Sequence, residues 1–274
     1  MSRMSIKLPE PWTVRQEEVL QSQEILEQHV SGYAVSQMIQ LARRQKNIDA
    51  SWPLWLEYLE RFKDMPEFGP NDPSRNRAVV IIASPHYWES KEHSPMVERN
   101  FRLFLGPDWN YYRYGFFFTQ GETAIDTYNR VLTSRAFWET YPEEHILIIQ
   151  PDTVCLSPLD ERFLRYGMIG APCGSLDKFT MNGGLSLRQR SVMLECLHAT
   201  PEPAEPEDVF FTRVIRDRAL APVPDLATAM EFSVESLWDG KTVPFGVHGT
   251  NKGYLAADAV RALIALAERV GPSD

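Results

Sequence analysis

The chain has 274 residues, of which 43% are hydrophobic and 11% aromatic, and it carries a formal net charge of −9. This hydrophobic content is sufficient to bury a core, so the composition excludes a largely disordered chain. The negative charge disfavours nucleic acid as a partner, because a protein that binds a phosphate backbone needs a basic surface. We expect no integral membrane segment and no secretory leader, since no stretch approaches the roughly 20 apolar residues of a span and the first residues lack an apolar core.

The three cysteines indicate the cellular compartment of the protein. Cys155, Cys173 and Cys196 are an odd number and show no CxxC spacing. This pattern favours reduced thiols over disulfide bonds or a zinc site. We therefore expect a cytoplasmic protein.

The first quarter of the chain is predicted to be helical. Apolar residues recur at gaps of three and four within residues 14–46. A second helix is expected from Ser51, with Pro53 tolerated in its first turn. The apolar residues of the first helix are Leu26, Val30, Ala34, Met38 and Leu41, and those of the second are Trp55, Tyr58, Leu59 and Phe62. We expect both sets to contact the main domain, with an interface between copies of the chain as the alternative.

The segment 66–77 is rich in Pro, Asn and Gly and is typical of a linker. It separates an N-terminal extension, residues 1–75, from a main domain, residues 76–274. In the main domain, predicted strands alternate with predicted helices, which indicates an α/β fold with a mostly parallel sheet flanked by helices. The expected strands are 78–83, 110–118 and 145–149, and the expected helices are 95–105, 122–138, 189–198 and 209–216.

A carboxylate follows the most apolar of these strands. Residues 146–149 are all Ile or Leu, and they are followed directly by Gln150-Pro151-Asp152. Open α/β sheets bind ligands just beyond the carboxyl ends of their strands, so Asp152 is placed to contact a metal ion or a sugar hydroxyl. The alternative is a turn residue that bonds the backbone of Val154 or Cys155.

Two later motifs also carry polar or flexible groups. Asn182-Gly183-Gly184 permits a ligand to approach the main chain closely, unless it is only a tight turn. Glu207 and Asp208 stand at the start of a predicted helix, where a carboxylate is either a reactive group or a helix cap.

Several short motifs follow one another in a characteristic order along the main domain. They are Tyr128–Leu132 with Phe137-Trp138, Ile146–Asp152, Ile169–Pro172, Asn182–Arg188, Glu207–Phe211, Phe232–Glu235 and Gly246–His248. Taken together they resemble a glycosyltransferase-like domain family of bacteria and fungi that was long of unknown function. Its members are similar to nucleotide-sugar transferases of the GT-A fold, which is a Rossmann-like α/β fold. The resemblance covers roughly residues 78–252.

The resemblance implies an enzyme that moves a sugar from a nucleotide-sugar to a hydroxyl of a glycan, a lipid-linked molecule or a small molecule. It implies a divalent cation, Mn²⁺ or Mg²⁺, held against the donor diphosphate by Asp152 and His248. Gln150 stands where such families place a first acidic residue, and its amide contributes hydrogen bonds but no charge.

The same resemblance implies roles for other residues. Asp208 would be the general base of an inverting transfer, with Glu207 as the alternative base. Arg188 is expected to pair either with the diphosphate or with Glu207. The expected donor-binding residues are Ser84, His86, Gln150, Asp152, Asn182, Gly183, Gly184 and Arg188. Two other functions stay open: a nucleotidyltransferase on a related fold, and a non-catalytic module that binds a sugar or nucleotide, which the missing acidic residue favours.

Overall fold

The computed structural model describes residues 32–83, 94–115, 123–173, 179–200 and 205–270. Its centre is a five-stranded sheet with the order β2-β1-β3-β6-β5. The strands are β1 (Arg77–Ala83), β2 (Asn110–Gly115), β3 (His145–Ile149), β5 (Met168–Cys173) and β6 (Thr180–Gln189). β1 pairs in parallel with β2 and β3, whereas β6 runs antiparallel to both β3 and β5. The predicted α/β class is confirmed, and the sheet is mixed because β6 opposes its neighbours.

A smaller sheet lies beside the carboxyl end of β3. It has the order β4-β8-β7 and consists of β4 (Thr153–Cys155), β7 (Ser233–Val234) and β8 (Gly246–His248). β4 is antiparallel to β8, so Thr153 stands opposite His248. This pairing joins the segment after β3 to a segment almost one hundred residues later in the chain.

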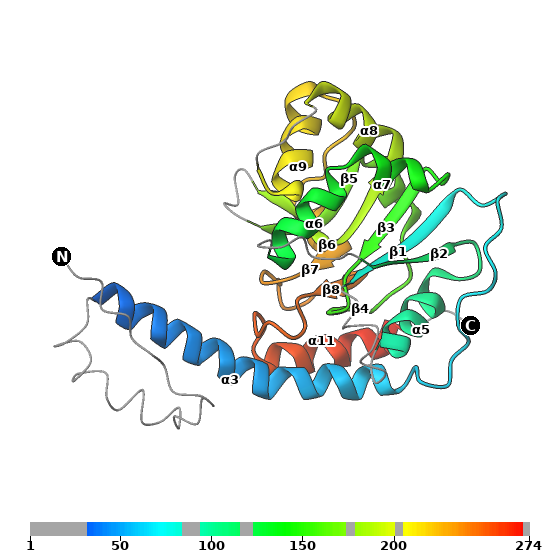
Figure 1. Cartoon of the computed structure of the whole chain (residues 1–274). Coiled ribbons are helices and arrows are strands. Elements are labelled where there is room, and N and C mark those ends of the chain that lie inside the picture. The colour runs from blue at the N-terminus through cyan, green and yellow to red at the C-terminus, as the bar shows by residue number, and fades with distance from the viewer. Residues whose placement is uncertain (1–31, 84–93, 116–122, 174–178, 201–204, 271–274) are drawn as a thin grey trace.

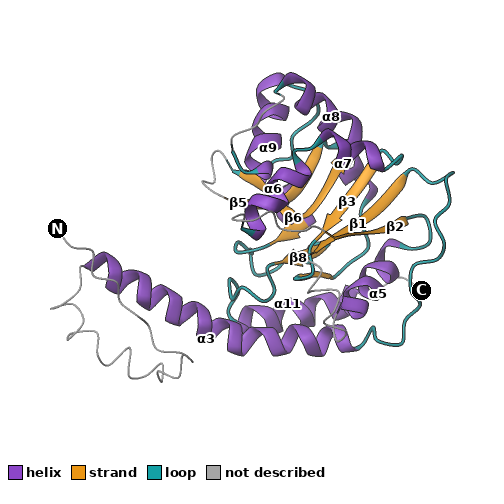
Figure 2. Cartoon of the chain, in the orientation of Figure 1, coloured by secondary structure: helices purple, strands orange, loops and turns teal. Residues whose placement is uncertain are grey.

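Helices cover both faces of the central sheet (Figures 1 and 2). One face carries α3 (Gly32–Glu60), α5 (Ser94–Leu105) and α11 (Ala257–Val270). The other carries α6 (Ala124–Leu132), α7 (Arg135–Thr140), α8 (Arg190–Ala199) and α9 (Glu207–Arg218). A 3-10 helix, η1 (Glu161–Arg165), and the helix α10 (Leu226–Phe232) connect later elements.

The strand β1 shows why both faces need cover. Side chains alternate between the faces of a strand, so Val79 and Ile81 pack with α3, α5 and α11, whereas Val80 and Ile82 pack with α6 to α9. The same alternation divides β3. A strand with two apolar faces is stable only between two helical layers, as the continuous apolar runs of the sequence predict.

The predicted pair of N-terminal helices is wrong within the described residues, because α3 continues through Pro53 as one helix. Pro53 has no N–H, so the helix loses one backbone hydrogen bond there. Burial of Trp55, Tyr58 and Leu59 in the core compensates for this loss. The core role of these three residues is confirmed, but Leu41 is 59% exposed instead of packed. The N-terminal half of α3 projects beyond the sheet (Figure 1).

Two further local predictions are corrected. The single helix expected over residues 122–138 is divided into α6 and α7, because Thr133 ends the first and Ser134 precedes the second. The Asn-Gly-Gly segment, expected as a loop or tight turn, lies inside the strand β6. Within the described ranges, no helix combines the length and the apolar character needed to cross a membrane.

Candidate functional site

The turn after β3 presents Asp152 at the end of the central sheet. Gln150 continues the pairing of β3 with β6, since its backbone N–H donates to the carbonyl of Gly184 at 2.8 Å. The hydroxyl of Thr153 closes the turn by donating to the carbonyl of Gln150 at 2.6 Å. The carboxylate of Asp152 is 12% exposed and is directed at side chains of β8 and of the turn that follows it.

Four charged or titratable residues meet at this point, and we call them the Asp152 cluster: Asp152, Glu235, His248 and Lys252. Nε2 of His248 lies 3.5 Å from Oδ1 of Asp152, and its Nδ1 lies 3.0 Å from Oε1 of Glu235. Nζ of Lys252 lies 3.2 Å from Oδ2 of Asp152 and 3.3 Å from Nε2 of His248. The imidazole is therefore placed between two carboxylates and beside an ammonium group.

These contacts alter the acid–base properties of the cluster. Burial alone would lower the pKa of His248, but Asp152 and Glu235 outweigh it and raise that pKa above its ordinary value. Burial would likewise raise the pKa of Asp152, but His248 and Lys252 hold it well below its ordinary value. Asp152 is therefore a carboxylate at neutral pH.

The amide side chains beside the cluster extend it along the sheet. Oε1 of Gln150 lies 2.9 Å from Nε2 of His248. Asn182 accepts a hydrogen bond from the backbone of Gly184 at 2.8 Å, and its amide nitrogen lies 3.4 Å from Oε1 of Glu235. The structure thus places Gln150 and Asn182, two of the predicted donor-binding residues, against the cluster.

The two glycines of β6 separate this cluster from a second charged pair. Adjacent residues of a strand face opposite sides of the sheet. A Cβ atom at Gly184 would overlap the ring of His248, and one at Gly183 would overlap the carboxylate of Glu207. The sequence needs glycine here because side chains from β8 and α9 fill the two positions, and not because the chain turns.

The second pair is the buried contact between Arg188 and Glu207. Nη1 and Nη2 of Arg188 donate to the two carboxylate oxygens at 2.6 and 3.0 Å, and both side chains are at most 2% exposed. Burial raises the pKa of Glu207, against the opposing effect of Arg188. Of the two partners expected for Arg188, the structure has Glu207, and we treat Arg188 below as a structural group.

Asp208 follows this pair at the first turn of α9. It is half-buried, and its Oδ1 accepts a hydrogen bond from the backbone of Val209 at 2.8 Å. The hydroxyl of Tyr128 donates to the carbonyl of Gly183 at 3.1 Å. Burial raises the pKa of Tyr128 strongly, and the charges of Glu207, Asp208 and Asp152 raise it further. The predicted base Asp208, its alternative Glu207 and the predicted metal ligand Asp152 therefore all raise the pKa of one tyrosine hydroxyl.

Cys173 links Asp208 to the Asp152 cluster from the end of β5. Its thiol pKa is raised by burial, and the charges of Asp208 and Glu235 add to this effect. The turn after β3 and Glu207 both contact the glycine pair of β6, the first through the backbone of Gly184 and the second at the position of Gly183. Ser84 and His86, predicted to bind the nucleobase and ribose, lie outside the described residues.

Three residues of this region were assigned no function from the sequence: Tyr128, Glu235 and Lys252. Tyr128 and Glu235 belong to motifs that carried the resemblance, so their position in those motifs was an available signal. Lys252 had none, because its contact with Asp152 bridges a separation of one hundred residues and depends on the pairing of β4 with β8.

The predicted ligands of a divalent ion, Asp152 and His248, are both engaged by other groups. Oδ2 of Asp152 lies against the ammonium of Lys252, and a cation at this distance repels a second cation. Within the part of the chain that the structure describes, no group of three or more His, Cys, Asp or Glu side chains is arranged to hold a metal ion. The side chains as they are arranged do not fit a divalent ion, so the expected Mn²⁺ or Mg²⁺ stays a prediction.

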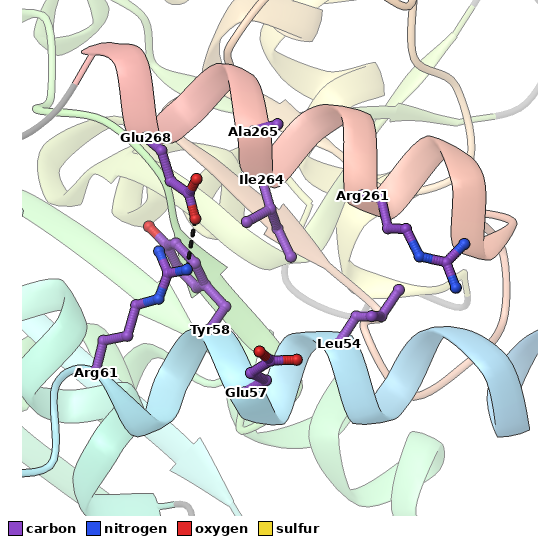
Figure 3. A pocket seen from close by; sticks show the side chains of 8 residues that line it. All are labelled: Leu54, Glu57, Tyr58, Arg61, Arg261, Ile264, Ala265 and Glu268. Atoms are coloured by element: carbon purple, nitrogen blue, oxygen red, sulfur yellow. Dashed lines mark ion pairs between the residues drawn. The ribbon is translucent and has the colours of Figure 1, made fainter.

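A separate hollow lies between α3 and α11 (Figure 3). Arg61 and Glu268 form an ion pair of 2.5 Å across it, and Tyr58 at its wall donates to the carbonyl of Cys155 at 3.3 Å. The residues that line it include none of the predicted site residues. Its polar side chains join the two helices, which makes it part of the packing of α3 on the main domain.

Comparisons with known proteins add the following. The profile of a family described as "Protein of unknown function (DUF5672)" matches residues 115–248, a range that includes Asp152, Asp208, Glu235 and His248 but ends before Lys252. No curated protein matches the chain.

Two solved structures of the glycosyltransferase GlyE from Streptococcus pneumoniae TIGR4, one of them the apo form, are similar to the chain at 12% and 13% identity. Their TM-scores are 0.32 and 0.30, and each match covers 53% of this chain and 44% of the GlyE chain. The chain therefore spans less than half the length of these proteins. Similarity at this level does not assign an activity.

Proposed function

We propose that this chain is a glycosyltransferase that moves a sugar from a nucleotide-sugar donor to a hydroxyl group of an acceptor. The observation that carries the proposal is the position of the Asp152 cluster at the carboxyl end of β3, where Gln150 and Asn182 border it. Ligands of open α/β sheets bind at this end of the strands. Titratable groups that perturb one another in a partly buried site are also a feature of functional sites.

The donor would lie over the turn after β3, with its diphosphate at the Asp152 cluster. The amides of Gln150 and Asn182 border the cluster and supply hydrogen-bond donors and acceptors of the kind that sugar hydroxyls require. Gly183 and Gly184 carry no side chains, which keeps the main chain of β6 close to the groups on both faces. The acceptor would approach from the side of Asp208.

In the proposed reaction Asp208 removes the proton of the acceptor hydroxyl while its oxygen attacks the anomeric carbon of the sugar. The bond between that carbon and the diphosphate oxygen breaks on the opposite side, so the configuration inverts. The proton ends on Asp208, and the electron pair leaves with the nucleoside diphosphate. Asp208 suits this role better than Glu207, because both oxygens of Glu207 are bonded to Arg188 in the interior.

A screen of UDP-, GDP- and CMP-linked sugars for slow hydrolysis tests the proposal without knowledge of the acceptor. We expect one donor class to be consumed, and its free nucleotide to raise the melting temperature by binding the native state. The proposal fails if no nucleotide-sugar is consumed and no nucleotide changes the melting temperature.

The role of Asp208 is tested by Asp208→Asn. This change should lower turnover by about 100-fold or more, because a general base contributes that much, and should leave nucleotide binding intact. Asp217→Asn, at an exposed position of the same helix, is the matched control and should keep full turnover. Unchanged turnover in Asp208→Asn would remove the assignment of the base while leaving the transferase proposal in place.

A further inference from the structure

The turn that carries Lys252 is fixed to the backbone of Asp152. Both the backbone N–H and the hydroxyl of Thr250 donate to the carbonyl of Asp152, at 3.1 and 3.0 Å. The turn closes when the N–H of Lys252 donates to the carbonyl of Gly249, which has a φ of 71°. A positive φ is strained for residues other than glycine. The main chain thus holds Lys252 above the carboxylate that its ammonium contacts.

The helix α3 holds the same turn from behind. Nε of Arg44 donates to the carbonyl of Lys252 at 2.7 Å, and Nδ2 of Asn47 donates to the carbonyl of Gly253 at 3.2 Å. A Cβ atom at Gly253 would overlap the backbone of α3 at Arg44. The N-terminal extension and the turn therefore fit closely, and α3 limits the positions that Lys252 can take.

Lys252 is also the most exposed member of the Asp152 cluster. Its side chain is 32% exposed, compared with 12% for Asp152, 11% for Glu235 and 3% for His248. Lys252 is therefore the member of the cluster whose side chain is most accessible from solvent, and it carries the sign of charge that an anion requires. Asp152 lies beneath the ammonium and holds it in position through the 3.2 Å contact.

We propose that the ammonium of Lys252 takes the place of a divalent ion in this site. It would supply the positive charge that binds the donor diphosphate and stabilises that group as it leaves, so that transfer proceeds without a metal. Fixed positive charge directed at a leaving group lowers the barrier in the same way as a bound cation. This inference rests on the proposed glycosyl transfer, and it gives the contact between Asp152 and Lys252 a function.

The first test measures binding of UDP and GDP by calorimetry in EDTA and again with Mn²⁺. We expect a nucleoside diphosphate to bind equally well in both, and hydrolysis of the matching nucleotide-sugar to continue in EDTA. If binding or turnover requires Mn²⁺, the inference is overturned and the proposed transferase function stands. If neither diphosphate binds under either condition, the inference is overturned, and the proposed function fails with it only if no nucleotide-sugar, CMP-linked sugars included, is consumed.

The second test replaces the lysine. Lys252→Met should weaken diphosphate binding in EDTA by about 10-fold or more, since a hydrogen bond to a charged group contributes at least that much. Lys252→Arg should retain more of the binding, because it keeps the charge. Lys241→Met, at an exposed lysine outside the cluster, is the control and should bind as the wild type does.

The melting temperature of each variant without ligand shows whether the fold is intact. Because Lys252 is partly exposed, we expect Lys252→Met to stay folded. Wild-type affinity and turnover in a folded Lys252→Met variant would overturn the inference. An equal loss of diphosphate binding in Lys252→Met and in the control Lys241→Met would also overturn it.

Discussion

The carboxylate of Glu207 occupies the space that a side chain at position 183 would need. A Cβ atom built on Gly183 would overlap Oε1 of Glu207 and would lie 2.8 Å from Nη2 of Arg188. Gly184 has the same relationship to the ring of His248 on the other face of the sheet. The two glycines therefore allow a buried ion pair and a buried histidine to contact the backbone of one strand from opposite sides.

Gly183→Ala should destabilise the protein by about 1–3 kcal/mol, because the added methyl group must displace the buried pair. Urea unfolding measures this change. Gly69→Ala is the control, since a Cβ at Gly69 would meet no atom within 4 Å and its backbone shows no positive φ. Equal stability of the two variants would show that the strand relaxes away from Glu207, contrary to the packing described here.

Removal of Arg188 should lower the stability of the protein, because the buried carboxylate of Glu207 loses its partner. Arg188→Leu leaves that carboxylate unpaired and should cost about 3–5 kcal/mol at neutral pH. Burial already raises the pKa of Glu207, and loss of the guanidinium raises it further. The pKa of Glu207 is thus higher in the folded protein than in the unfolded chain, where it has its ordinary value of about 4.5. The contribution of Glu207 to stability is therefore fully present below about pH 4.5 and is lost as the pH rises through the folded-state pKa.

The free energy of unfolding of Arg188→Leu should therefore approach that of the wild type as the pH is lowered from 7 toward 5. Denaturant unfolding at several pH values measures this trend. The double variant Arg188→Leu/Glu207→Leu is the control, because it has no buried carboxylate to titrate. A gap between Arg188→Leu and wild type that stays constant with pH would contradict the assignment.

The sequence predicted the parts of this fold that depend on local pattern. The runs of β1 and β3 are apolar on both faces, which indicated strands between helical layers, and the step from Ile149 to Gln150 marked the end of the sheet. Three of the four core residues expected near the end of the N-terminal extension, Trp55, Tyr58 and Leu59, are buried in α3, and the fourth, Phe62, is buried just beyond it. Each of these features is decided by residues within a few positions of one another.

Features that depend on distant packing were not predictable in this way. Asn182-Gly183-Gly184 has the composition of a turn, and only the side chains of Glu207 and His248 explain why it is a strand. Pro53 indicated a helix start, but core contacts of the following residues outweighed it. The assembly of copies through the N-terminal helices and a hydroxyl-bearing acceptor stay predictions.

The three cysteines should differ in their reactivity with iodoacetamide. Cys155 and Cys196 are buried, and burial raises the thiol pKa of Cys196 to about 12. Cys173 is partly exposed, so it should be the first of the three to be alkylated in the native protein. Burial raises its pKa as well, so its rate should increase as the pH rises above 9, since the thiolate is the reactive form.

The same experiment reports on the site, because the charges of Asp208 and Glu235 act on the Cys173 thiol. The nucleotide that raises the melting temperature should slow alkylation of Cys173 and leave the other two thiols unaffected. Peptide mass spectrometry identifies the modified residue. Modification of Cys155 or Cys196 before Cys173 would contradict the burial described here, and a lack of protection would place the nucleotide elsewhere.

Under the proposed role of Lys252, the hydrogen bond from α3 to the turn of Lys252 makes Arg44 a positioning residue. Arg44→Ala removes the hydrogen bond to the carbonyl of Lys252 and the stacking of the guanidinium on Tyr254, 4.7 Å from the ring centroid. Misplacement of a charge at a reacting centre lowers turnover, and we expect a loss of about 10-fold in the rate of donor hydrolysis. Arg43→Ala, at the neighbouring exposed position, should have no such effect.

A double-mutant cycle separates this positioning role from a general loss of stability. If Arg44 acts through Lys252, the variant Arg44→Ala/Lys252→Met should be no slower than Lys252→Met alone, because the group that Arg44 positions is already absent. If Arg44 acts only on the fold, the two losses should multiply, and the melting temperature should fall with Arg44→Ala in both backgrounds. If the two losses multiply, α3 does not position Lys252, and its role is limited to packing through Trp55, Tyr58 and Leu59.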